Sequence, residues 1–404
     1  MSRALIITGA NVIDPRGEVT KRGLSIEGDR IVAVTNRSAD YIDATGLHIA
    51  PGIVDLGVFS VDKPAFIAGG ITRVALMPDQ SPVLDDPGPV QRAALAAKPD
   101  LWVHPLGAAT RGLEGKELAE YALMARTGAK AIATGRAWIA DSGVMLRVLT
   151  YAASLGLTVI AHAEDGGMTH GAVATAGETA TRLGLASAPA AAEAIAMARD
   201  IALAEGCGAR LHFRQVTTAR GFDLIRVAKA KGLSITCGIT PAHLFLSDLA
   251  VSDFRTFARL SPPLRSEDDR KAAIEAVRDG TIDVLCSAHD PCGPEAKRLP
   301  FADAASGMAG AETLLALGLG LVRDGVIALP RLFAMLSANP AAILGVEGGS
   351  LEAGAAADLV VFDAEQPWQI NGARFAAAAD NTPFDKMPTQ GKVRQTIKGG
   401  RILS

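Results

Sequence analysis

Residues 49–60 read "IAPGIVDLGVFS", a stretch with the pattern of a strand buried on both faces. Pro51 and Gly52 break the preceding segment, and the apolar run that follows is typical of strands in parallel sheets. Gly57 and Phe59 occupy alternate positions near the end of this run, so we expect them to point the same way. A pair of metal-binding histidines would need this spacing, but glycine and phenylalanine stand here instead.

Seven further apolar runs follow this strand and alternate with segments of helical period. Segments such as "SGVMLRVLTYAASLG" mostly end in the glycine expected just past a helix. Eight strands with crossover helices predict an α/β protein with a (β/α)8 barrel over residues 52–345. Only "SVDKPAFIAGG" separates the first two strands, which leaves room for barely one helical turn. The predicted strands lie near 53–59, 72–79, 100–107, 129–134, 157–163, 209–216, 233–239 and 282–288.

The two ends of the chain do not follow the barrel pattern but resemble each other. The segment "ALIITGANVIDPRGEVTKRGLSIEGDRIVAV" consists of short strand-like runs separated by turn signals. "GSLEAGAAADLVVFDAE" and "GKVRQTIKGGRILS" continue this style near the other end. We therefore expect residues 1–51 and 346–404 to form one small β-sandwich domain together.

Composition excludes several classes of function. The 404 residues are 49% hydrophobic, which suffices for a large core, and the formal charge of −3 arises from 40 basic and 43 acidic residues. Such a balance predicts neither a nucleic-acid partner nor an anionic membrane partner. The first residues lack a secretory pattern, and no apolar run approaches about 18 residues, so a cytoplasmic location is expected. The four cysteines form no CxxC pair and are expected to be buried thiols.

In such a barrel the active site is expected at the carboxyl ends of the strands. The first strand offers Gly57 and Phe59, and the fifth offers His162 and Glu164 within "AHAED". Other strand ends carry Asp79, Thr134, Gln215, His243, Ala288, His289 and Asp290.

Nearly the whole chain resembles the dihydroorotase branch of the cyclic amidohydrolases. The matching motifs are "PGIVDL", "MPDQSPVLDDP", "AHAED", "SPPLRSEDDRKAAIEAVRDGTIDVL", "HDP" and "GSLEAGAAADLVVFD", in this order. The resemblance implies the barrel fold derived above. It also implies one or two zinc ions that activate a water to open or close the dihydroorotate ring.

Carried over residue by residue, the resemblance shows that most of the family's metal ligands are missing here. The His-x-His pair of the first strand corresponds to Gly57 and Phe59, and the substrate arginine to Val61. The fourth-strand ligand falls at Thr134, and Lys130 is about 13 Å away toward the other strand end. Three further positions that differ are Gln215 for a histidine, Ala288 for the aspartate that acts as ligand and base, and Asp79 for a substrate-binding asparagine.

Of the implied ligands only His162 remains, and a catalytic zinc needs about three protein ligands. No metal and no other cofactor is therefore expected. His289 keeps its place in the "HDP" motif but is not itself a ligand in the family. His162 and His289 are interpreted as cleft histidines left after ligand loss. Two alternatives stay open: a weak site rebuilt from His162, Glu164 and Asp290, or a metal-free hydrolase using a His162–Glu164 or His289–Asp290 pair.

Four other histidines are isolated in strand or loop contexts. We expect each of them to be exposed or to be hydrogen-bonded in the core. They are His48, His104, His170 and His212.

Two functional hypotheses follow. The first is a catalytically inactive dihydroorotase-like protein of pyrimidine biosynthesis, oligomeric and bound to the aspartate carbamoyltransferase catalytic chain, as the resemblance to noncatalytic homologues implies. The second is a working dihydroorotase or related cyclic amidase with an altered metal site, in which case zinc is expected. Loss of both the ligands and the substrate arginine favours the first, since a shifted substrate preference would spare the metal.

Overall fold

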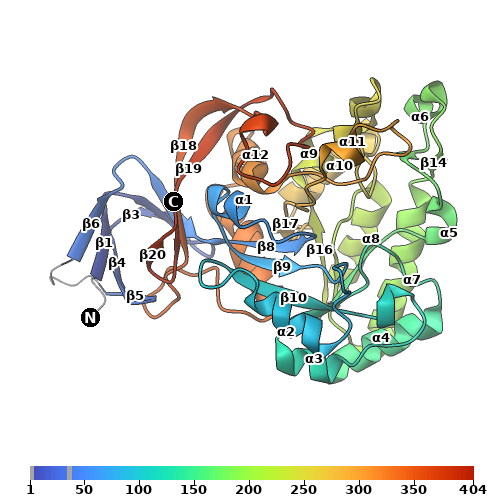
Figure 1. The fold of residues 1–404 in the computed structure, drawn as a ribbon, viewed down its shortest axis with the longest axis horizontal. Coiled ribbons are helices and arrows are strands. Elements are labelled where there is room, and N and C mark those ends of the chain that lie inside the picture. The colour runs from blue at the N-terminus through green and yellow to red at the C-terminus, as the bar shows by residue number, and fades with distance from the viewer. Residues whose placement is uncertain (1–3, 34–38) are drawn as a thin grey trace.

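Eight parallel strands form the central sheet in the computed structural model, which describes residues 4–33 and 39–404 (Figure 1). Their order in the sheet follows the chain, and each neighbouring pair is parallel. The predicted (β/α)8 barrel is thus confirmed, with shorter strands than the apolar runs suggested. The strands are β8 (Ile53–Val58), β9 (Ile71–Leu76), β10 (Trp102–Ala108), β11 (Ala131–Ala133), β12 (Val159–Ala161), β15 (Leu211–Phe213), β16 (Ile235–Ile239) and β17 (Val284–Leu285).

The last strand meets the first through side chains and one backbone contact. Asp55 of β8 accepts a hydrogen bond from the Ser287 backbone N–H at 2.9 Å and another from the Ser287 hydroxyl. Farther along, the Phe59 N–H donates to the His289 carbonyl at 2.9 Å. β17 and β8 are the two ends of the sheet and are not paired through a ladder of backbone hydrogen bonds. The contacts of Asp55 and Phe59 join them and close the barrel.

Helices follow most strands and cover the outside of the sheet (Figure 1). The crossover between β8 and β9 is the shortest, as expected, and holds a single six-residue helix, α1 (Lys63–Ala68). The remaining α-helices are α2 (Pro87–Leu95), α3 (Tyr121–Thr127), α4 (Ser142–Ser154), α5 (Gly166–Thr169), α6 (Glu178–Leu183), α7 (Ala191–Cys207), α8 (Ala219–Ala230), α9 (Pro241–Phe245), α10 (Glu267–Arg278), α11 (Pro294–Lys297), α12 (Leu314–Arg323), α13 (Leu329–Phe333) and α14 (Asn339–Leu344).

Helix boundaries follow local chemistry. Asp141 and Ser266 begin α4 and α10 by accepting hydrogen bonds from backbone N–H groups of the first turn. Gly208, at φ +68°, ends α7 in the left-handed conformation that glycine adopts without steric cost. Short connecting elements are the 3₁₀ turns η1 (Arg111–Leu113), η2 (Asp248–Val251), η3 (Thr256–Ala258), η4 (Ala311–Thr313) and η6 (Gly372–Arg374), the π-helix η5 (Ala334–Ala338), and the strand pair β13 (Ala174–Thr175) and β14 (Ser187–Ala188).

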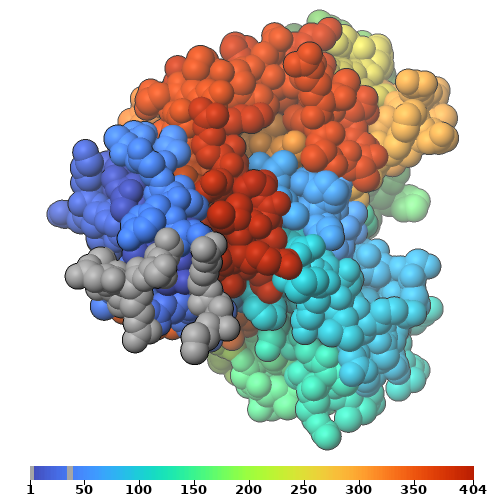
Figure 2. Space-filling model, turned by 60° about the vertical axis from the view of Figure 1, so that its left-hand side comes forward, coloured from blue at the N-terminus to red at the C-terminus, as the bar shows by residue number. Residues whose placement is uncertain are grey.

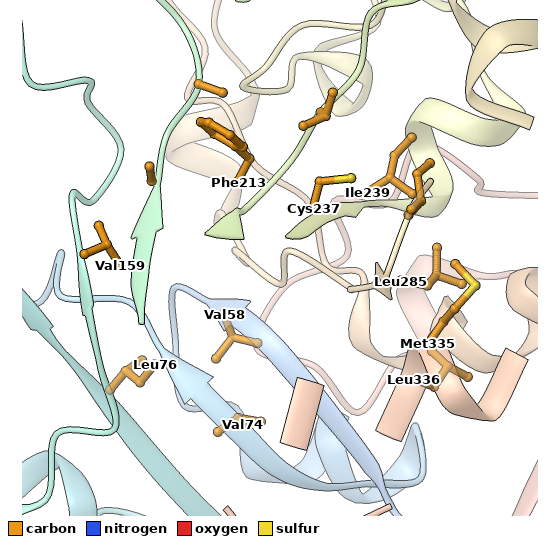
Figure 3. Packing of buried hydrophobic residues seen from close by; sticks show 14 of the residues in the cluster. Val58, Val74, Leu76, Val159, Phe213, Cys237, Ile239, Leu285, Met335 and Leu336 are labelled. Atoms are coloured by element: carbon orange, nitrogen blue, oxygen red, sulfur yellow. The ribbon is translucent and has the colours of Figure 1, made fainter. Parts of the chain in front are cut away.

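Two apolar clusters pack the barrel from inside and outside. The inner cluster contains Val54 and Leu56 of β8 together with Leu106 of β10. The outer cluster lies between strands and helices; Figure 3 shows Val58 and Leu76 as members of it. Because alternate strand residues serve the two clusters, both faces of the sheet are apolar, as the sequence pattern of buried strands requires.

Strands from both ends of the chain share one six-stranded sheet, in the order β20-β19-β18-β7-β2-β3. Figure 2 shows the C-terminal segment, in red, against the N-terminal strands, in blue. A four-stranded sheet, β5-β4-β1-β6, lies beside it. The strands are β1 (Ala4–Thr8), β2 (Asn11–Ile13), β3 (Val19–Lys21), β4 (Leu24–Glu27), β5 (Arg30–Val32), β6 (Ala39–Asp43), β7 (His48–Pro51), β18 (Leu359–Gln369), β19 (Pro388–Lys398) and β20 (Arg401–Ile402).

Candidate functional site

The carboxyl ends of the barrel strands surround a very small cavity. The space that it offers to water amounts to about 20 Å³, enough for roughly one water molecule. Side chains, rather than solvent, therefore occupy the place where active sites of this fold lie. Residues at this mouth include Phe59, Arg136, Arg214, Gln215, His243, Ala288 and Asp290.

Gly57 and Phe59 reach the mouth through an irregularity at the end of β8. Pairing with β9 shifts between Leu56 and Val58, and Gly57 has φ +102°, a conformation that side chains other than glycine rarely adopt. Phe59 is 8% exposed, and its ring contacts two guanidinium groups. The Cζ atoms of Arg136 and Arg214 lie 3.7 Å and 5.0 Å from the ring centre, respectively.

Arg214, which the sequence reading did not single out, fills the space between the first and sixth strands. It is 2% exposed, and a Cβ added to Gly57 would meet its Cδ at 3.2 Å. Its guanidinium donates to Gln215 Oε1 at 3.1 Å, while Nε has no hydrogen-bond partner among the described residues. Burial lowers the pKa of Arg214 from its usual value. The mouth thus holds a buried cation beside the positions implied for metal ligands.

Asp290 and Asp79 both bind Arg136, a second arginine that the sequence reading missed. Arg136 donates from its guanidinium to Asp290 at 2.7 Å and from its backbone N–H to Asp79 at 3.0 Å. Asp79 also closely approaches Gly135, where a Cβ would lie 2.9 Å from its Oδ1. Asp79 therefore shapes the turn after β11, and Asp290 balances one of the two arginines at the mouth.

His162 and Glu164 belong to a buried network around Arg265. His162 Nε2 lies 3.5 Å from Glu164, and Arg265 donates to Glu164 at 2.6 Å. The His162 backbone N–H donates to the Thr134 hydroxyl at 2.9 Å, so Thr134 holds this strand end in place. Burial alone would raise the pKa of Glu164, but His162 and Arg265 lower it to about 2. A carboxylate of such low pKa is a poor general base at neutral pH.

Arg265 also reaches a second buried carboxylate. It lies 3.6 Å from Glu193, which is fully buried on α7. The Glu193 oxygens accept hydrogen bonds from the backbone N–H and hydroxyl groups of Thr217 and Thr218, at distances of 2.5 to 3.0 Å. The network therefore fixes the loop after β15 next to the mouth.

His289 pairs with Asp62 and not with its neighbour Asp290. The Ala311 N–H donates to His289 Nδ1 at 3.3 Å, so the proton lies on Nε2, which donates to Asp62 at 3.2 Å. His289 is fully buried. The proposed His289–Asp290 pair is wrong because the two side chains point to different partners, as alternation along a strand predicts.

Gln215 and Ala288 replace a histidine and an aspartate of the implied site without restoring a ligand. Gln215 is 4% exposed and accepts from Arg214, and Ala288 has a positive φ of 45° in the loop that follows β17. His243 is held by Thr240 at 2.8 Å and by the Pro262 carbonyl at 3.1 Å. Both of its ring nitrogens are therefore occupied.

The residues at the mouth do not fit a zinc centre. Within residues 4–33 and 39–404, no group of three or more histidine, cysteine, aspartate or glutamate side chains is arranged to hold a metal ion. The open alternative of a site rebuilt from His162, Glu164 and Asp290 is therefore not supported, because Arg265 and Arg136 pair separately with the two carboxylates. A zinc ion there would also lie near the buried charge of Arg214.

Glu312, in the 3₁₀ turn η4, provides a test of how burial changes the pKa of a carboxyl group in this barrel. It accepts a hydrogen bond from the Ala377 N–H at 3.0 Å, and burial raises its pKa from 4.5 to about 7. A raised carboxyl pKa contributes stability that is present below pH 4.5 and lost as the pH rises through 7. Glu312→Gln, which keeps the acceptor oxygen, is expected to become increasingly more stable than the parent between pH 5 and 8.

Urea denaturation of parent and variant at a series of pH values measures this difference. Glu275→Gln, on an exposed face of α10, is the control for removing one surface carboxylate from the chain. A difference for Glu312→Gln that stays constant from pH 5 to 8 would contradict the assignment.

Comparison with known proteins agrees with the fold. The Amidohydrolase family model matches residues 65–403. L-hydantoinase from Arthrobacter aurescens superposes with a TM-score of 0.86 at 22% identity, over 99% of this chain and 96% of that one. A dihydropyrimidinase from Brevibacillus agri gives 0.85 at 21% identity.

Several curated relatives match over nearly their full length. A dihydroorotase-like protein of Pseudomonas aeruginosa is 38% identical over 417 residues, covering 98% of each chain. The dihydroorotase of Pelotomaculum thermopropionicum is 38% identical over 419 residues, covering 99% of this chain and 98% of its own. The described part of this chain also contains no helix with the length and apolar character needed to cross a membrane. The family model and the full-length relatives show that the chain belongs to the amidohydrolase family, as a dihydroorotase-related member.

Proposed function

We propose that this chain is a noncatalytic dihydroorotase homologue of pyrimidine biosynthesis that binds the aspartate carbamoyltransferase catalytic chain. The observation that carries the proposal is the mouth filled by Arg214 and Phe59, with about 20 Å³ of space for water. Pockets that hold small organic molecules typically offer about 300–1,000 Å³. A cyclic amide has no room to bind there, and Asp290, the carboxylate that lines this space, is already bound by Arg136.

An active cyclic amidase is the second candidate, favoured by the curated relatives that are called dihydroorotases. Without metal, the acid–base pair of such an enzyme would be His162 with Glu164, 3.5 Å apart. Glu164 is already bound by Arg265 and has a pKa of about 2, so it would accept a proton poorly. An assay of dihydroorotate hydrolysis with zinc analysis of the purified chain distinguishes the candidates: turnover with near-stoichiometric zinc would establish the second.

The loops at the mouth carry exposed apolar side chains suited to a partner. Leu249 is 61% exposed and Phe254 is 48% exposed, both after β16, and Leu299 after β17 is 44% exposed. Lys297 donates to the carbonyls of Thr256 and Arg259 at 3.1 and 3.4 Å, which ties the two loops together. Aromatic and aliphatic anchors of this kind dominate the energy of many protein interfaces. We take this mouth surface, Leu249, Phe254 and Leu299, as the docking region.

Co-expression with the aspartate carbamoyltransferase chain of the same organism tests the proposal. We expect a joint elution in size exclusion with light scattering, and a transcarbamoylase activity that falls when this chain is omitted. Leu249→Glu should weaken the complex at least tenfold, because a charge would be buried at the interface. Leu155→Glu, at the end of α4 and 37% exposed, is the matched control and should leave binding unchanged. Separate elution at micromolar concentration, with unchanged activity, would reject the proposed partner.

A further inference from the structure

A large cleft lies at the other end of the barrel, beside the strands contributed by the chain ends. It offers about 750 Å³, within the range of small-molecule sites, whereas the mouth offers about 20 Å³. Its walls include Trp102 and His104 of β10, Arg73 of β9, and Lys398 at the end of β19. Figure 2 shows the red C-terminal segment next to a light-blue to cyan part of the barrel. Three separate parts of the chain thus build this basal cleft.

Positive charge predominates in the basal cleft. The three carboxylates of the wall are already paired with arginines: Asp358 with Arg73 at 2.7 Å, and Asp29 and Glu347 with Arg30. Within the described part of the chain, no carboxylate lies within ion-pairing distance of Lys98 or Lys130, which are both exposed. The six cationic residues of the wall are Arg30, Arg73, Lys98, Lys130, Lys398 and Arg401.

Two buried polar atoms of the wall have no hydrogen-bond partner among the described residues. They are His104 Nε2 and Arg73 Nε, on side chains that are 8% and 5% exposed. A buried polar atom left without a partner lowers the stability of the fold, so such atoms usually meet a ligand or water. The expectation that His104 is exposed or hydrogen-bonded is therefore wrong, whereas His212 is bonded to Thr236 at 2.9 Å.

The surroundings hold Arg73 rigidly. Asp358 binds the Arg73 guanidinium and also accepts from Trp102 Nε1 at 3.1 Å and from the Gly399 N–H at 2.8 Å. Two cations approach the Trp102 ring, with Arg73 Cζ at 5.2 Å and Lys398 Nζ at 3.9 Å from its centre. A donor fixed in this way loses little entropy when it binds a ligand, which is the property of a preorganised site.

We propose that the basal cleft binds a phosphorylated small molecule, with the phosphate groups held by Arg73, His104, Lys98 and Lys130. The unpaired lysines and the free Arg73 donor match the oxygens of phosphate, which accept several charge-assisted hydrogen bonds. The excess of cations disfavours a cationic ligand, and the described residues form no metal-binding cluster here. Inorganic phosphate alone would leave most of the 750 Å³ unfilled, so an organic phosphate such as a nucleotide fits better. This site is independent of the partner proposed for the mouth surface.

Isothermal titration of the full chain at low salt with ATP, pyrophosphate, inorganic phosphate and adenosine tests the proposal. We expect ATP to bind more tightly than inorganic phosphate, and adenosine not to bind. Equal affinities for ATP and inorganic phosphate would assign the site to free phosphate and still support phosphate chemistry. Adenosine binding as tightly as ATP, or no binding of any phosphate compound at millimolar concentration, would overturn it.

Variants locate the site. The double variant Lys98→Ala and Lys130→Ala changes only exposed side chains and should lower ATP affinity at least tenfold, since contacts to charged groups are worth about 1.5–3 kcal/mol each. Lys116→Ala with Lys271→Ala changes the net charge equally, away from the cleft, and should alter affinity less than twofold. His104→Leu should weaken ATP binding while the chain retains a cooperative thermal transition. Equal losses in the two lysine pairs would show a general charge effect and reject the site.

Discussion

Replacing both Gly57 and Phe59 with histidine is expected to yield a chain that neither binds zinc nor hydrolyses dihydroorotate. The two residues would complete the His-x-His pair of the first strand, and the retained His162 is already paired with Glu164. Thr134, Gln215 and Ala288 still provide no ligands from the other strands. Metal catalysis needs the complete ligand set held in place. The added side chain at Gly57 would also crowd Arg214, whose Cδ would lie 3.2 Å from the new Cβ, so Arg214 would have to shift.

The same double variant should be less stable by about 3 kcal/mol or more. A residue other than glycine at φ +102° costs about 1–3 kcal/mol, and loss of the buried Phe59 ring adds a comparable amount. Gly46→His is the control for the backbone term, because Gly46 has φ +81° and open space around its Cβ position. Metal analysis, a hydrolysis assay and urea denaturation give the three readouts. Stoichiometric zinc or measurable turnover in the double variant would contradict the description of the mouth.

Removal of the Arg265 side chain should have the largest effect on stability of any single change at the barrel. Arg265→Ala leaves Glu164 and Glu193 buried without the cation that lies 2.6 Å and 3.6 Å from them. Breaking a buried pair by removing one partner typically costs about 3–5 kcal/mol, because a charge then remains uncompensated in the interior. Urea denaturation at pH 7 measures the loss.

Arg278→Ala is the matched control for this variant. Arg278 forms an exposed ion pair with Glu275 on α10, and such pairs contribute about 0–1 kcal/mol. If Arg265→Ala costs no more than Arg278→Ala, the buried network does not hold the loops as described.

The barrel could be predicted from sequence because each strand is apolar on both faces and each apolar run is followed by a segment of helical period. Ile53 and Val54 illustrate the reason: both are fully buried, one in the outer cluster and the other in the inner cluster. Strand ends were less predictable. The run near 209–216 contains only three strand residues, Leu211–Phe213, since the chain turns into the mouth immediately after Phe213.

The motifs identify which ligand positions have changed. They do not predict which side chains fill the space that the ligands and the metal would occupy. Arg214 stands beside a ligand position rather than at one, and strand alternation would direct it away from the mouth. It reaches the mouth because it follows the last strand residue and because Gly57 leaves space for it. Its one signal in the sequence was a charged residue at the end of an otherwise buried apolar run. Asp62, the partner of His289, lies 227 residues away, and no local pattern could connect the two.

The sheet that joins β7 to β18 has a consequence for how the chain is made on the ribosome. β7 ends at Pro51, and β18, its antiparallel partner on one side, begins only at Leu359. At roughly 5–20 residues per second, synthesis of the intervening residues takes on the order of 15–60 s. Throughout this interval one edge of β7 has no partner strand, and an unpaired apolar edge invites aggregation. Because β2 occupies the opposite edge of β7, early pairing with β2 leaves the edge that faces β18 open until the last strands emerge.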